Sequence, residues 1–132
     1  PFRHIRDLHG FFHQALAALD SEQQAGLSFY RSIMLERILD YIPEEQVPFL
    51  ISPDILRLEE AEGQYSFSLL DTLHSYLECN CNLLRTAEHL YVHKNTLLYR
   101  LNHIKSILRC DLNDADARLL LMLSFKLLER GC

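Results

Sequence analysis

Residues 82–108 contain two apolar patterns of helical spacing, separated by a connection of only three residues, Tyr91–Val92–His93. The first pattern, LLRTAEHL, follows Asn82, a residue type that caps helix N-termini well. The second is predicted to be a helix over about 94–108, because four apolar residues lie within about 60° of one another on a helical wheel: Leu97, Leu101, Ile104 and Leu108. A short helix, a tight turn and a longer helix predict a helix-turn-helix unit.

The rest of the chain is also predicted to be helical, so the expected fold class is an all-α helical bundle. Apolar residues recur at helical spacing over 5–20 and over 28–42, where Pro43 ends the pattern, and again over 66–78. A last helix is expected over about 114–130 with Asn113 as its cap, and its predicted apolar residues are Leu119, Leu120, Leu123 and Leu127.

Three segments follow from these patterns. Residues 1–42 are expected to form N-terminal helices, and residues 43–65 a connector with short helical pieces, since it holds three prolines, Gly63 and several glutamates. Residues 66–132 are expected to form the domain that contains the helix-turn-helix. The chain begins at Pro1 without a methionine, which favours an excised piece of a longer protein.

Charge is distributed unevenly along the chain. The formal net charge is −5, but residues 79–109 carry five basic side chains against Glu88 alone, together with three histidines. A local positive potential attracts phosphates whatever the total charge is. A solvated basic face is the alternative explanation, and charge by itself does not decide between them.

The predicted helix over 94–108 has a polar side opposite its apolar stripe. Asn95, Tyr99 and Asn102 lie together there, and a helix in the major groove presents such side chains to base edges. Simpler roles are open for the polar residues of this helix. Asn95 and Thr96 could satisfy N–H groups of the first turn, and Arg100 could form an ion pair with Glu88. The candidate DNA-contacting residues are Arg85, His93, Lys94, Asn95, Thr96, Tyr99, Arg100, Asn102 and His103.

Other function classes find little support in the residues. The CNC triplet at 79–81, even with His74 and His89 nearby, lacks the spacing and the second pair that structural zinc sites use, so neither a metal nor a cofactor is expected. Asp71, His74, Ser75 and Glu78 could be arranged on paper as a catalytic set. On a helix, however, i and i+1 neighbours do not face each other, and the sequence has no Gly-rich phosphate loop or nucleophile elbow, so no enzyme is predicted. No apolar run reaches the roughly 20 residues of a membrane span and no signal peptide begins the chain, which favours the cytoplasm.

Residues 72–108, TLHSYLECNCNLLRTAEHLYVHKNTLLYRLNHIKSIL, resemble the C-terminal DNA-binding domain of the PucR/CdaR family of bacterial transcriptional regulators. The family pattern of TL-x-x-YL, N-x-N, T-A-x-x-L and H-x-N-T-x-x-Y-R-L is complete here, and its spacing is similar to that of the Fis-like helix-turn-helix. The family often has glycine where Arg109–Cys110 stand, a departure outside the motif.

The resemblance implies a DNA-binding module that works as a homodimer on double-stranded DNA. It also implies that residues 1–42 are the tail of a truncated sensor-like domain, and that a small-molecule effector is sensed by a region missing from this chain. The leading hypothesis is therefore a sequence-specific DNA-binding module that inserts helix 94–108 into the major groove. The alternative is a helical protein-interaction or dimerisation module without DNA binding, which the apolar run LLLML at 119–123 would support.

Overall fold

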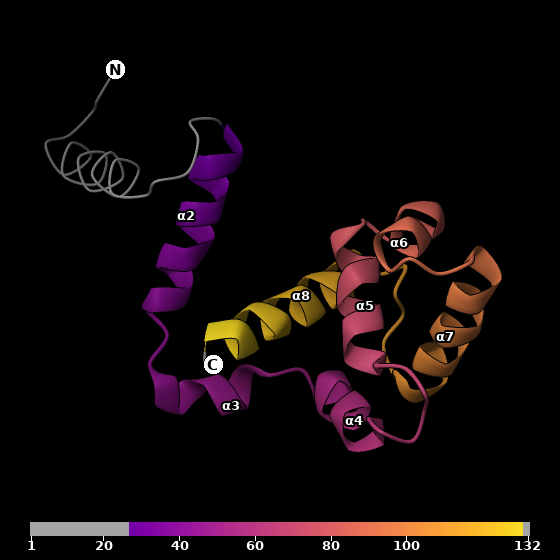
Figure 1. The fold of residues 1–132 in the computed structure, drawn as a ribbon. Coiled ribbons are helices and arrows are strands. Elements are labelled where there is room, and N and C mark those ends of the chain that lie inside the picture. The colour runs from indigo at the N-terminus through magenta and orange to yellow at the C-terminus, as the bar shows by residue number, and fades with distance from the viewer. Residues whose placement is uncertain (1–26, 131–132) are drawn as a thin grey trace, which may run out of the picture. The chain divides into compact units, whose positions relative to one another are not determined.

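The structure is a computed structural model that describes residues 27–130 (Figure 1). Every regular element in that range is helical, which confirms the predicted all-α class. The helix expected over 5–20 lies outside the described residues. The elements in chain order are α2 (Leu27–Asp40), η1 (Glu44–Gln46), α3 (Val47–Leu50), α4 (Pro53–Ala61), α5 (Leu69–Glu78), α6 (Leu83–His89), α7 (Lys94–Ile107) and α8 (Ala115–Arg130).

The chain divides into two compact units, one ending at Pro43 and one beginning at Glu44. Helix α2 belongs to the first unit and agrees with the helix predicted over 28–42, although it ends two residues earlier. Leu39 of its expected apolar stripe is buried, whereas Leu35 and Ile38 are exposed.

Helix α5 is the central element of the second unit, because it contacts α4, α6, α7 and α8 (Figure 1). Helices α4 and α8 also touch each other, and α7 packs on both α4 and α6. This arrangement gives the unit one shared core. Its most completely buried apolar side chains are Ile55, Leu58, Leu69, Leu73, Leu97, Ile104, Leu121 and Leu127.

Helix α4 lies within the stretch expected to be a connector, yet it is part of this core. Ser52 caps it by accepting a hydrogen bond from the Asp54 N–H, and Pro53 occupies its first turn, where no N–H is needed. Ile55 and Leu58 have no exposed surface. Two apolar residues three positions apart in a nine-residue helix are too weak a pattern to predict such burial.

Helix α8 differs from expectation in its cap and in its buried face. The Asp114 carboxylate, not Asn113, accepts from a first-turn N–H, that of Asp116 at 3.2 Å, while the Asn113 amide bonds to Asp111. Leu119 and Leu120, two of the four apolar residues predicted for this helix, are 65% and 57% exposed. Five consecutive apolar residues surround a helix on all sides, so the pattern could not select the face that α8 buries, which consists of Leu121, Ser124, Phe125 and Leu127.

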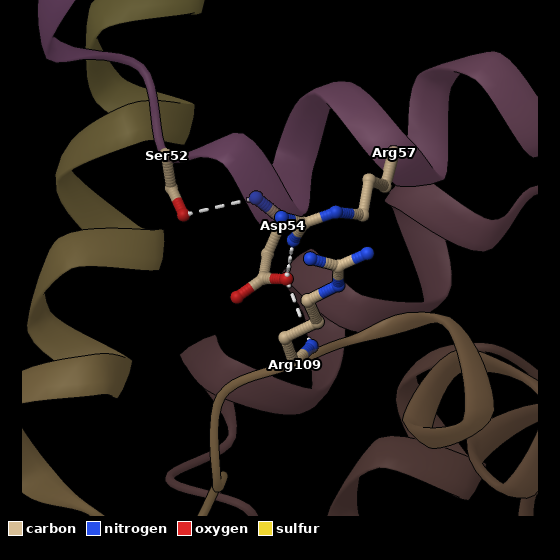
Figure 2. A network of polar contacts seen from close by, with 4 residues as sticks. All are labelled: Ser52, Asp54, Arg57 and Arg109. Atoms are coloured by element: carbon tan, nitrogen blue, oxygen red, sulfur yellow. Dashed lines mark hydrogen bonds and ion pairs between the residues drawn. The ribbon is translucent and has the colours of Figure 1, made fainter.

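A buried carboxylate fastens α4 to the segment between α7 and α8. Asp54 is 7% exposed, and Figure 2 shows its Oδ1 between the Arg57 guanidinium and the Arg109 backbone N–H, which donates at 2.9 Å. Burial alone would raise the pKa of Asp54, but the Arg109 N–H, the Cys110 thiol and Arg57 outweigh it, so the pKa lies below the usual 3.8. Burial, together with the contact between the Cys110 thiol and Asp54, raises the pKa of that thiol to about 11.

We expect Asp54→Asn to lower the free energy of unfolding by about 1–3 kcal/mol at pH 7, because it weakens a buried charge-assisted acceptor. The folded-state pKa of Asp54 is depressed, so its stabilisation is present above the unfolded-state pKa and is lost as pH falls through the folded value. Urea unfolding at pH 7 and at about pH 3 should therefore show a smaller pH dependence for the variant. The exposed Asp116→Asn serves as the control, and an equal effect of both substitutions would contradict this role for Asp54.

Candidate nucleic-acid interface

Helix α6 begins where the sequence predicted it. The Asn82 side chain accepts hydrogen bonds from the backbone N–H groups of Leu84 and Arg85, each at 3.1 Å. Thr86 is fully buried, and its hydroxyl donates to the Asn82 carbonyl, while Ala87 beside it is 6% exposed. A small residue at this point lets α6 pack closely on the helices that it contacts, α5 and α7.

The turn after α6 closes with the paired hydrogen bonds of a Schellman motif. The Val92 N–H donates to the Ala87 carbonyl at 2.9 Å, and the Tyr91 N–H to the Glu88 carbonyl at 3.2 Å. Tyr91 takes the left-handed conformation that this motif requires, with φ of 53°, although glycine adopts it more easily. Its side chain is 96% exposed, so packing of the ring does not explain the choice of residue.

His93 caps α7. Its Nδ1 accepts a hydrogen bond from the Asn95 N–H at 3.2 Å, which satisfies one of the unpaired donors of the first turn. An accepting Nδ1 leaves the ring proton on Nε2. The exposed imidazole can therefore donate from Nε2 to an acceptor in front of the helix while it caps with its other nitrogen.

The two sides of α7 separate as the helical wheel predicted. Leu97, Leu101 and Ile104 are at most 3% exposed, and Leu108, which caps the helix C-terminus, is 8% exposed. Asn95 and Asn102 on the opposite side are exposed, and Tyr99 is 57% exposed.

The candidate residues fall into three groups in the structure. His93, Lys94, Asn95 and Thr96 form an exposed cluster at the start of α7, and Asn102 is exposed two turns further on. Arg85 is exposed on α6, not on α7. Arg100 and His103 are only half-buried and take part in contacts with a loop outside the helix-turn-helix.

That loop, residues 62–68 between α4 and α5, contributes two aromatic residues that the sequence analysis did not select. The Arg100 guanidinium lies 4.9 Å from the centre of the Phe67 ring, and no ion pair joins Arg100 to Glu88 among the described residues. The Tyr65 ring lies 5.0 Å from that of His103. The sequence contained one indication of these contacts: two aromatic residues, separated by one residue, stand in the otherwise polar stretch GQYSFS.

Two lysines of the basic stretch 79–109 line different hollows of the surface. Lys94 lies beside an open hollow of about 530 Å³ between α6 and the start of α7, which His93 and the acidic residue Glu88 also line. Lys105 lines a different concavity of about 550 Å³, where α7 meets the end of α5 and the start of α8, together with Arg118. These two lysines of residues 79–109 therefore line separate hollows.

His74, which the sequence analysis considered for a metal site and for a catalytic set, contacts neighbouring side chains in the fold. His74 stacks on Phe125 at 4.5 Å and lies 3.6 Å from Glu78 and 3.7 Å from Glu129, linking α5 to α8. Within residues 27–130 there is no group of three or more His, Cys, Asp or Glu side chains that could hold a metal ion. None of the helices in that range has the length and apolar character needed to cross a bilayer.

These features define a helix-turn-helix domain: a capped short helix, a Schellman turn, and a second helix with one buried and one exposed side. Residues 69–127 match the family model of the PucR C-terminal helix-turn-helix domain. This part of the chain is therefore a helix-turn-helix domain of the PucR family, of the kind found in transcriptional regulators.

Curated relatives extend the similarity beyond the domain. The purine catabolism regulatory protein of Bacillus subtilis is 31% identical over 92% of this chain and 23% of its own length. The proline-responsive transcriptional activator PutR of the same organism is 29% identical over 98% of the chain and 33% of its own length, and the carbohydrate diacid regulator of Escherichia coli is 33% identical over 76% and 26%. The chain thus spans about a quarter to a third of the length of these three relatives. No solved structure matches it significantly.

Tyr91→Gly should raise the free energy of unfolding by about 0.5–1 kcal/mol, since it removes left-handed strain and the exposed ring contributes little packing. Tyr91→Ile should lower it by about 1 kcal/mol, because a β-branched side chain suits this conformation least. Urea unfolding of the three proteins measures both changes. A glycine variant less stable than the parent would mean that the tyrosine ring stabilises the turn.

Proposed function

We propose that this domain binds double-stranded DNA sequence-specifically by inserting the N-terminal half of α7 into the major groove. The observation that carries the proposal is the separation of α7 into a fully buried apolar stripe and an exposed polar side that begins at the capped N-terminus. Asn95 and Asn102 present amide groups suited to base edges, and the Tyr99 hydroxyl can address a base or the adjacent backbone.

Phosphate contacts would come from the start of α7. The helix N-terminus carries partial positive charge, and Lys94 adds a full charge there. His93 would donate from Nε2, the nitrogen that its capping role leaves protonated. Thr96 follows in the same exposed turn, and Arg85 on α6 would meet the backbone beside the groove.

We further propose that the chain acts as a homodimer on two half-sites, as a bacterial transcriptional regulator in the cytoplasm. PutR is named as proline-responsive, and recognition of a small-molecule effector by this protein would fall to sequence outside the stretch that the relatives share with this chain. Insertion of α7 into the groove needs no enzymatic step, because it depends only on hydrogen-bond donors, hydrogen-bond acceptors and positive charges held in position.

One observation favours the alternative of a protein-interaction module. Leu119, Leu120 and Leu128 of α8 are 65%, 57% and 39% exposed. Exposed leucines on one helix suit a contact between protein chains. Such a contact is compatible with DNA binding if it joins two copies, so it supports the dimer as readily as it supports the alternative.

Selection of binding sites from random duplex DNA, followed by salt titration of the affinity, tests the proposal. DNA binding predicts an enriched consensus and a steep negative dependence of affinity on salt. A palindromic consensus would support the homodimer and give the half-site spacing. No consensus and no salt dependence would leave the protein-interaction alternative in its place.

Lys94→Ala should weaken binding to all duplexes alike and should reduce the slope of log affinity against log salt by about 0.9, the effect of one lost phosphate contact. Fluorescence anisotropy over a series of salt concentrations measures the slope. Lys126→Ala is the matched control, because that lysine on α8 pairs with Glu129 at 2.8 Å. An unchanged slope in Lys94→Ala would remove Lys94 from the phosphate contacts.

Asn95→Ala should relax base preference at one position of the selected site, and should cost about 1–3 kcal/mol on the preferred duplex. The measurement is competition binding against duplexes changed at single positions. Asn113→Ala, in the segment before α8, should leave the preference unchanged. Equal loss of affinity on every sequence would argue that Asn95 only stabilises the helix start.

A further inference from the structure

The loop between α4 and α5 is held in a defined conformation. Both carboxylate oxygens of Glu62 accept from the Leu69 N–H, at 3.2 and 3.0 Å, and one also accepts from the Leu70 N–H at 3.3 Å. Gly63 turns the chain with φ of 88°, and Ser68 caps α5 by accepting from the Asp71 N–H. Glu62 thus joins the two ends of the loop and directs its charge at the N-terminus of α5.

The fixed loop places two aromatic rings against α7. Besides the Arg100 guanidinium over its face, Phe67 lies 6.3 Å from the Tyr99 ring in an edge-on arrangement and 5.5 Å from the Tyr65 ring. Tyr99 in turn meets His103 edge-on at 4.4 Å. The loop therefore contacts the residues that border the exposed side of α7.

We propose that Phe67, outside the helix-turn-helix, is a positioning residue for DNA recognition: its ring face holds the Arg100 guanidinium ready for a phosphate beside the groove. The inference rests on the proposed DNA-binding function and adds a second structural element, the α4–α5 loop, to the recognition surface. Tyr99 contacts the same ring in an edge-on arrangement.

The cation–π contact suits an arginine that must also bind a phosphate. It occupies none of the hydrogen-bond donors of the guanidinium, so the five N–H groups of Arg100 stay available. Among the described residues, no acceptor takes a hydrogen bond from the Arg100 side chain, and no carboxylate pairs with it. Holding the long side chain before DNA arrives reduces the rotamer freedom lost on binding.

The test measures the affinity of the 132-residue chain for its selected duplex in Phe67→Leu, Arg100→Gln and the double variant. Phe67→Leu alone should weaken binding about two- to fivefold, the range expected for one cation–π contact at a half-exposed site. In the Arg100→Gln background the same change should weaken binding by less than about 1.5-fold, because the group that Phe67 positions is then absent. Phe67→Tyr should restore affinity to within about twofold of the parent, since it keeps the aromatic face.

Controls separate positioning from folding. Phe49→Leu, on α3 with its ring 83% exposed, should leave affinity unchanged. A trifluorinated phenylalanine at position 67 keeps the shape of the ring but weakens its negative face, so it should reproduce the loss of Phe67→Leu without disturbing the helices. Circular dichroism on each variant records whether the helices remain intact.

Equal losses from Phe67→Leu in the parent and in the Arg100→Gln background would overturn the proposal. The absence of a loss from both Phe67→Leu and the trifluorinated phenylalanine would also overturn it. Those outcomes differ from failure of the proposed function, in which the parent chain itself would select no consensus and would show no salt-dependent affinity for DNA. Coupling between Phe67 and Arg100 in a parent chain that binds DNA would support the positioning role.

Discussion

Burial of the apolar stripe of α7 is the constraint on which the rest of the recognition surface depends. Leu97 and Ile104 have no exposed surface, and burial of each such side chain contributes about 1.5–3 kcal/mol. An exposed ion pair contributes about 1 kcal/mol or less, so the hydrophobic contacts decide how α7 is rotated. Since all side chains of a helix turn together, that rotation alone leaves Asn95 and Asn102 exposed.

The helix-turn-helix was predictable because its determinants are local. Asn82 caps α6 through a backbone N–H only two residues further along the chain. Just before it, Asn80 and Cys81 take left-handed conformations, and the connection between α6 and α7 has only three residues. The stripe of α7 follows from spacing within one helix, and the predicted bounds 94–108 differ from the observed ones by one residue. The DNA-contacting roles of the exposed residues depend on a partner, so they stay predictions.

The remaining features depend on contacts between distant segments. Asp54 and Arg109 are 55 residues apart, and no local pattern reveals that the two meet. The place of α4 in the core and the rotation of α8 depend likewise on which neighbours cover them. Phe67 was overlooked because a loop aromatic has no helical period, and its significance appears only when the Arg100 contact is seen.

Several carboxylates of this acidic chain are held in hydrogen bonds and ion pairs. Glu62 accepts from a backbone N–H at the N-terminus of α5, Asp54 pairs with Arg57 and accepts from the Arg109 backbone N–H, and Glu129 pairs with Lys126. In contrast, Arg85 and Lys94 form no ion pair among the described residues. Charges farther away than about 8–10 Å are largely screened at physiological salt, so the potential at the start of α7 depends on nearby groups such as Lys94 and Glu88 more than on the net −5. The sign of the total charge is therefore a poor guide to what the start of α7 attracts.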